Sequence, residues 1–242
     1  MKNYVLITIM MVISHITFGQ PEPGVESGLF RLEQGTFNSQ QLMMGKRRPP
    51  ADVIGDYYLT AYWQEGSFVM KDGRKSSTYL LRYDVENALL EIRWKEEQVK
   101  VVGEEFLSSF VWQNKDTGKE QQFINAHHFS YGDTRLSGFM ELMHTGHDSL
   151  LIKTEAYLKK PTYVEGLDMG IRHAEILKQD KFFVSRKGKL SEIRNRKDIL
   201  TLVEEPYQKA VKQFMKSEHI ASDQREGLLR VWKFYESIRE NL

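Results

Sequence analysis

Apolar residues that alternate with polar ones, between closely spaced turn signals, most constrain how this chain can fold. This pattern dominates residues 55–188. In one clear case Leu90, Ile92 and Trp94 alternate with charged residues, the period of two that is typical of a half-buried strand. The pair Asp72-Gly73 marks a hairpin turn, because glycine accepts the positive φ that such turns need. The region therefore predicts strands joined by short turns.

No long helical pattern lies between these strand candidates, which favours an antiparallel meander over βαβ units. We expect an α+β, mainly β fold: an antiparallel β-meander, as a half-barrel, barrel or sandwich, with a C-terminal helical cap. The segments predicted to be extended are 56–63, 67–71, 78–83, 88–94, 98–102, 106–112, 121–129, 136–144, 149–158, 182–185 and 190–193.

In the C-terminal part of the chain the spacing of the apolar residues changes from that of a strand to that of a helix. Residues 197–203 predict a short helix, and Pro206 suits the first turn of the next, where its missing N–H costs nothing. Asp223 and Glu226 have the spacing of a capping box at the start of a third helix. The apolar stripe of that helix predicts core packing rather than a ligand platform; it contains Leu228, Val231, Trp232, Tyr235 and Ile238.

The first residues have the pattern of an export signal. Lys2 precedes an apolar run at 5–13, and the small residues Thr17 and Gly19 stand at −3 and −1 from a cleavage site before Gln20. The run is too short to span a bilayer, which argues against a retained membrane anchor. We therefore expect residues 1–19 to be a cleaved signal peptide and the protein to be secreted across the inner membrane.

The chain contains no cysteine, so it has no disulfide and cannot carry the cysteine-linked lipid of a bacterial lipoprotein. We expect a soluble periplasmic or cell-surface protein without a transmembrane segment in the mature chain. The sequence divides into the signal peptide 1–19, an irregular lead-in at 20–54, an antiparallel β domain at 55–195 and a helical segment at 196–242 packed on it.

Charge is divided unevenly along the mature chain. Residues 20–180 hold 19 Lys/Arg and 24 Asp/Glu, whereas residues 181–242 hold 14 and 9, so the total is zero. A neutral total argues against nucleic-acid binding. The basic segment 181–197 suggests docking to an anionic surface or an envelope protein. The alternative, which we favour, is that it forms a solvated face beside the acidic body.

The histidines give the one metal hypothesis. Glu141, His144, His147 and Asp148 cluster around a predicted hairpin turn, and imidazoles with carboxylates are zinc ligands. On a regular strand Glu141 and His144 point to opposite faces, so a solvated hairpin tip is the favoured alternative. His127-His128 are also expected to face opposite sides of a strand.

Other catalytic patterns are missing from the sequence. It contains no Gly-x-Ser-x-Gly nucleophile motif and no glycine-rich phosphate loop. Adjacent carboxylates such as Glu104-Glu105 and Glu204-Glu205 suit turns and helix ends. We therefore assign no catalytic, cofactor-binding or metal-binding residue and expect no cofactor.

Two stretches carry a resemblance to a protein family. One is 57–92, with Phe68-Val69-Met70-Lys71-Asp72-Gly73 and Leu80-Leu81-Arg82-Tyr83-Asp84. The other is the tail, with Arg186-Lys187-Gly188-Lys189, Val211-Lys212-Gln213-Phe214 and Phe234-Tyr235. Their order resembles a family of uncharacterised secreted envelope proteins of Gram-negative bacteria. The resemblance implies an exported β-rich domain with a helical end, and it implies no activity.

Together these observations predict an exported envelope protein with a non-enzymatic binding or scaffold role, whose partner the sequence does not identify. The alternative hypothesis is a metal-dependent hydrolase that uses His144 and His147 at the hairpin.

Overall fold

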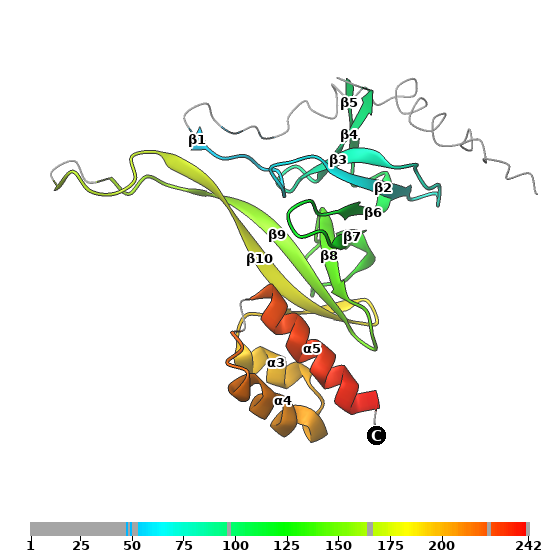
Figure 1. Cartoon of the computed structure of the whole chain (residues 1–242), viewed down its shortest axis with the longest axis vertical. Helices are drawn as coiled ribbons and strands as arrows, with labels where there is room; N and C mark the ends of the chain where they lie inside the picture. The colour runs from blue at the N-terminus through cyan, green and yellow to red at the C-terminus, as the bar shows by residue number, and fades with distance from the viewer. Residues whose placement is uncertain are drawn as a thin grey trace, which may run out of the picture.

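The computed structural model describes residues 47, 49, 53–95, 98–163, 167–221 and 224–240. The predicted signal peptide, nearly all of the lead-in and Asp223 lie outside these residues. The described chain forms one large mixed sheet with three helices after it (Figure 1). No helix in this part of the chain is long and apolar enough to cross a membrane.

The elements agree closely with the strands and helices expected from the sequence. The strands are β1 (Val53–Ile54), β2 (Gln64–Met70), β3 (Tyr79–Asp84), β4 (Leu89–Lys95), β5 (Gln98–Gly103), β6 (Leu107–Gln113), β7 (Glu120–Asn125), β8 (Phe139–His144), β9 (Ser149–Lys159), β10 (Ala174–Arg186) and β11 (Lys189–Ile193). A 3-10 helix, η1 (Ala126–His128), follows β7, and the α-helices are α3 (Arg196–Leu202), α4 (Glu205–Ser217) and α5 (Arg225–Glu240).

The sheet is mainly a meander, with two departures from it. Strands lie in the order β1-β10-β9-β8-β7-β6-β2-β3-β4-β5, and β11 also pairs with β10. Strand β2 is inserted between β6 and β3, and β1 runs parallel to β10. The strands at the two ends of this order, β1 and β5, do not pair with each other, so the sheet is open. The mainly β fold with a helical cap is confirmed, whereas a closed barrel is not formed.

Three hydrophobic clusters form the core of the described chain, and the two larger ones hold the sheet and the helices together. The first lies among β2–β8, where Phe110 stacks on Phe123 with ring centroids 4.5 Å apart and meets Phe139 edge-on. The second joins β9, β10 and β11 to the three helices and contains the predicted α5 stripe. In that stripe Trp232 is 1% exposed, so the stripe packs in the core as predicted.

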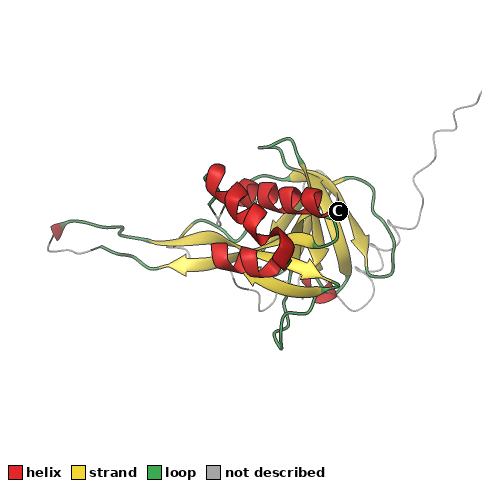
Figure 2. Ribbon diagram, turned by 90° about the horizontal axis from the view of Figure 1, so that it is seen from below, coloured by secondary structure: helices red, strands yellow, loops and turns green. Residues whose placement is uncertain are grey.

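The helical cap covers the sheet around β9 and β10, as Figure 2 shows from below. Helix α3 begins with a capping box, in which Asn195 accepts from backbone N–H groups and Asp198 accepts from the Asn195 N–H. Pro206 stands in the first turn of α4, as expected. These start signals and the apolar stripes explain why this part of the chain is helical.

One segment expected to be extended is not a strand, and another ends earlier than expected. Residues 56–63 form bends, and within them Tyr58 makes only an isolated bridge to Asp84. The reason is local: the Tyr58 N–H donates to Asp56 Oδ1 at 2.9 Å in an Asx turn instead of joining a ladder. The predicted strand 121–129 ends at Asn125, because the Asn125 side chain accepts from the His127 N–H and caps η1.

A long hairpin of β9 and β10 projects from the rest of the molecule (Figure 1). The two strands pair continuously from Ser149↔Ser185 to Lys159↔Glu175. The sequence predicted only the 182–185 part of β10. Large hydrophobic side chains remain exposed on this hairpin: Tyr157, Leu158, Leu167 and Met169.

Candidate functional site

The histidine hairpin differs from its predicted geometry. Glu141 pairs with Ile152 and His144 with Leu150, and the register shifts between Leu142 and His144. A β-bulge at this point adds one residue to β8, so alternation is broken. Glu141 and His144 therefore lie on the same face of the sheet, and the prediction that they point to opposite faces is wrong.

The histidines contact different groups, each of which belongs to the junction with α5. His144 Nε2 lies 2.9 Å from Glu236 Oε2. His147 Nδ1 lies 3.1 Å from Asp148 Oδ1, and its Nε2 lies 3.2 Å from Arg239 Nη2. The residues described by the structure include no group of three His, Cys, Asp or Glu side chains placed to hold a metal ion. The hairpin tip packs on α5 and gives no geometric support to the hydrolase hypothesis.

Asp148 is the centre of this junction. It is 1% exposed, and Arg186 donates to both of its carboxylate oxygens, with Nη2 to Oδ2 at 2.6 Å. Burial opposes ionisation, but the hydrogen bonds and charge of Arg186, together with His147, outweigh it and lower the pKa of Asp148. Its backbone N–H donates to Glu236 and its carbonyl accepts from Trp232. Asp148 thus ties β9, β10 and α5 together.

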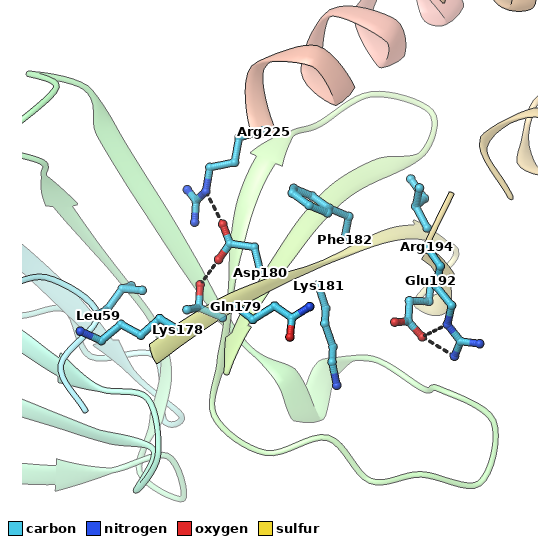
Figure 3. Close-up of a pocket in the computed structure, with 11 residues that line it drawn as sticks. Leu59, Lys178, Gln179, Asp180, Lys181, Phe182, Glu192, Arg194 and Arg225 are labelled. Carbon is cyan, nitrogen blue, oxygen red and sulfur yellow. Dashed lines mark hydrogen bonds and ion pairs between the residues drawn. The ribbon is translucent and has the colours of Figure 1, made fainter. Parts of the chain in front are cut away.

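A pocket of about 660 Å³ lies beside β10 (Figure 3). This volume is in the range of small-ligand and peptide sites. Its lining comes from β9, β10, the end of β11, the start of α5 and the segment after β1. The lining residues are Leu59, Thr154, Lys178, Gln179, Asp180, Lys181, Phe182, Glu192, Ile193, Arg194 and Arg225.

The inner wall of the pocket is a fixed group of charges. Asp180 accepts from Thr154 Oγ1 at one oxygen and from Arg225 Nε at the other, both at 2.7 Å. Arg225 Nη1 donates to Glu141 Oε2 at 2.6 Å. Burial lowers the pKa of Arg225, but its hydrogen bond to Asp180 and the charge of Glu141 outweigh this effect and raise the pKa above its ordinary value. Arg225 is therefore a permanent cation at the inner wall.

The outer wall carries more exposed charges. Lys178 Nζ lies 3.3 Å from Asp56, and Lys181 Nζ lies 2.7 Å from Glu155. Arg194 lies 2.6 Å from Glu192 and remains 67% exposed. Lys181 points to the side of β10 opposite to Asp180 and Arg225 (Figure 3). The pocket is thus lined on both faces of β10 by charged groups that already have partners.

The basic segment 181–197 contributes to the pocket and to the junction. Of its seven Lys/Arg, Lys181 and Arg194 line the pocket, Arg186 binds Asp148, and Arg196 donates to the carbonyl of Ile220. Lys187, Lys189 and Lys197 make no ion pair with another residue in the described ranges. Two of the seven cations, Lys181 and Arg186, therefore pair with carboxylates outside the segment, and Arg194 pairs with Glu192 inside it.

Three other histidines, and one carboxylate from each of two predicted pairs, make side-chain contacts. His127 lies 3.7 Å from Glu104, and His128 Nε2 lies 3.3 Å from Ser108 Oγ. His173 lies 3.4 Å from Glu175. Among the carboxylate pairs, Glu204 binds Arg239 at 2.6 Å. None of these groups lines the pocket.

Sequence reasoning did not find Asp180 or Arg225. The two residues lie on different elements, 45 positions apart, and neither belongs to a recognisable motif. The available signal was the basic segment beginning at Lys181, which borders the pocket. The part of β10 that the sequence did not predict, 174–181, supplies Lys178, Gln179 and Asp180 to the pocket lining.

The arrangement suits recognition of a charged group better than proton transfer. Both oxygens of Asp180 are hydrogen-bonded, and Arg225 is held charged between Asp180 and Glu141. A fixed cation beside partly apolar surface from Phe182 and Ile193 can bind a carboxylate on an otherwise extended ligand. Comparison with family models, curated proteins and solved structures finds no match.

Proposed function

We propose that this chain is an exported envelope protein that binds a partner, without catalysing a reaction, through the pocket beside β10. The observation that carries this proposal is the pocket itself. Its volume is about 660 Å³, its lining mixes apolar and charged side chains, and its inner cation Arg225 is fixed by two carboxylates. Preorganised charge of this kind favours binding, because little ordering entropy is lost on association.

The projecting hairpin supports a binding role. Tyr157 is 47% exposed and Leu158 is 49% exposed, and both lie on β9, which also contributes Thr154 to the pocket. Neighbouring residues of a strand point to opposite faces, so the hairpin exposes one of these hydrophobic side chains on each face, where either can contact a partner. The hairpin and the pocket therefore offer adjoining surfaces to a macromolecular partner.

The export part of the proposal rests on the sequence. The pattern of Lys2, the apolar run 5–13, Thr17 and Gly19 supports cleavage before Gln20 and delivery to the periplasm or cell surface. The resemblance to secreted envelope proteins supports the same destination. Docking of the segment 181–197 to an anionic surface has less support, because four of its seven cations have partners within the molecule.

Site-specific photo-crosslinking in envelope preparations tests the proposal. A photoreactive residue at Gln179, which is exposed in the pocket, is expected to give a discrete adduct, whereas one at the exposed Lys233 of α5 is not. Adding Arg225→Met to the Gln179 probe is expected to reduce the adduct several-fold, with folding checked by thermal unfolding. Equal adducts at both positions, or none at Gln179, would contradict binding at the pocket.

The mass and the location of the protein in the same envelope preparations test export. The mature protein is expected to have the mass of a chain beginning at Gln20 and to fractionate with the envelope. A protein that retains residues 1–19 and stays in the cytoplasm would contradict this part of the proposal.

A further inference from the structure

The two edges of β10 are used differently. One edge pairs with β9 along Glu175–Ser185 without interruption. The other edge pairs with β1 at residues 174 and 175 and with β11 from Phe182 to Arg186. Within the residues that the structure describes, no strand pairs with this second edge at 176–181. The gap spans six residues, or about 20 Å at the rise of a strand.

The backbone groups that face this gap follow from the β10–β11 turn. Lys187 and Gly188 both have positive φ, 51° and 79°, as in a two-residue type I′ hairpin. Its closing pair, Arg186 and Lys189, then exchanges hydrogen bonds, and strand residues alternate in direction. Lys178 and Asp180, an even number of residues before Arg186, therefore direct their N–H and C=O groups into the gap.

The contact with Gly55 agrees with this direction. A Cβ placed on Gly55 would lie 3.0 Å from the carbonyl oxygen of Ile176, so that oxygen also faces the β1 side. Gly55 has a φ of +97°, a conformation that glycine adopts readily, and it turns the chain out of β1. Asp56 then reaches Lys178, and Leu59 reaches the pocket.

The gap is closed at both ends. Gly55 ends β1 on one side, and Ile193 ends β11 on the other, just before the Asn195 cap of α3. An added strand is therefore limited to about six residues. Such a short, bounded edge can accept one segment without the open-ended pairing that leads to aggregation.

The pocket overlaps the C-terminal part of this gap. Five consecutive residues of β10, 178–182, line it, together with the three residues 192–194 at the end of β11. A strand laid along the gap would send alternate side chains to the face of Phe182 and Arg225 and to the face of Lys181, which Figure 3 shows on opposite sides of β10. Backbone pairing and side-chain pockets are thus available together.

Charge selects the kind of segment. The lining contains four cationic residues, Lys178, Lys181, Arg194 and Arg225, against two anionic ones, Asp180 and Glu192, an excess of two cations within the lining itself. Glu141, outside the lining, remains paired with Arg225. Asp56 and Glu155, also outside it, pair with Lys178 and Lys181, but these pairs are exposed, and an exposed ion pair contributes only about 0–1 kcal/mol, so carboxylates of a bound segment can replace them. Resting on the proposed function, we infer that the pocket binds an extended, acidic segment of a partner protein, which is added as a strand to β10 between β1 and β11.

Blocked synthetic peptides test the inference on the purified protein. The probe is a hexapeptide of alternating valine and glutamate, and its charge control alternates valine and lysine. The glutamate probe is expected to bind at least about fivefold more tightly than the lysine peptide, because its carboxylates meet a cationic lining. The double variant Lys178→Gln, Arg194→Gln is expected to remove most of this difference, and the matched control Lys187→Gln to leave it unchanged.

N-methylation of the probe separates strand addition from charge attraction. In a paired strand alternate N–H groups face the neighbour, so methylating one alternate set is expected to weaken binding at least about tenfold and methylating the other set much less. Equal effects of the two sets, or failure of the glutamate probe to bind, would overturn strand addition. Failure would also follow if the chain's own N-terminal segment or a second copy already filled the gap.

The experiments distinguish failure of the proposed function, partner binding at the pocket, from failure of the inferred strand addition to β10. If the Gln179 adduct forms and depends on Arg225 while both N-methylated probes bind equally, the pocket binds a partner but not as an added strand. If no Gln179 adduct forms, binding at the pocket is itself contradicted.

Discussion

Replacing Asp148 by asparagine tests how the helical cap is joined to the sheet. The aspartate is 1% exposed and accepts hydrogen bonds from Arg186 at both oxygens. Asparagine keeps the shape but replaces one acceptor oxygen with a donor that faces the guanidinium. The ion pair is lost, and an unmatched polar contact is left at a buried position.

The magnitude follows from the unequal burial of the two partners. Breaking a fully buried ion pair costs about 3–5 kcal/mol. The side chain of Arg186 is 44% exposed, so water partly replaces its lost partner. We therefore expect Asp148→Asn to lower the free energy of unfolding by about 2 kcal/mol, which for a chain of this size lowers Tm by about 4–8 °C.

Urea and thermal unfolding at neutral pH measure this change. Lys187→Gln in the turn after β10 is the matched control, since an exposed substitution of this kind changes stability by less than about 0.5 kcal/mol. The pH dependence adds a second criterion. The pKa of Asp148 is lowered in the folded protein, so its contribution is present above the unfolded value of about 3.9 and is lost as pH falls through the folded value.

The stability difference between the parent protein and Asp148→Asn should therefore shrink as the pH falls below about 4. Equal stabilities at pH 7 would refute the view that Asp148 joins the cap to the sheet. A difference that stays constant down to the lowest pH at which both proteins are folded would refute the assigned role of its charge.

Three further predictions concern the core, the hairpin and a buried lysine. Trp232→Ala should destabilise by about 3–5 kcal/mol in urea unfolding, because the side chain is 1% exposed; a loss below about 1 kcal/mol would contradict its core position. Gly146→Ala should destabilise by about 1–3 kcal/mol, because the new Cβ displaces the Glu236 carboxylate from His144 and from the Asp148 N–H, and unchanged stability would contradict those contacts. Burial lowers the pKa of Lys153, so stability should rise as pH increases from its folded pKa toward about 10.4, and Lys153→Met should abolish that rise.

Most of the sheet was predictable because its strands are half-buried, so apolar and polar residues alternate along them. Strands β3 to β6 each lie within a few residues of their predicted ranges, and only short connections separate them. The helices were predictable from Pro206 and from the stripe that includes Trp232, since both signals are local. The insertion of β2 between β6 and β3 was not, because strand order depends on contacts between distant segments.

The pocket shows the same limit more clearly. The first half of β10, at 174–181, mixes exposed Lys178 and Gln179 with half-buried Asp180, because the hydrophobic clusters include β10 only from Phe182 onward. That irregular burial removes the alternation by which a strand is recognised. The bulge between Leu142 and His144 likewise reversed the predicted orientation of His144, and no sequence signal marks it.

Hydrogen exchange at the backbone amides of Lys178 and Asp180 tests most directly that β10 receives an added strand. In the free protein these amides face the gap, so they should exchange fast, while the amides that β10 donates to β9 should exchange slowly. Saturation with the valine–glutamate probe should slow the Lys178 and Asp180 amides at least about tenfold. Slow exchange of these two amides in the free protein, or no change when the probe is bound, would contradict the account.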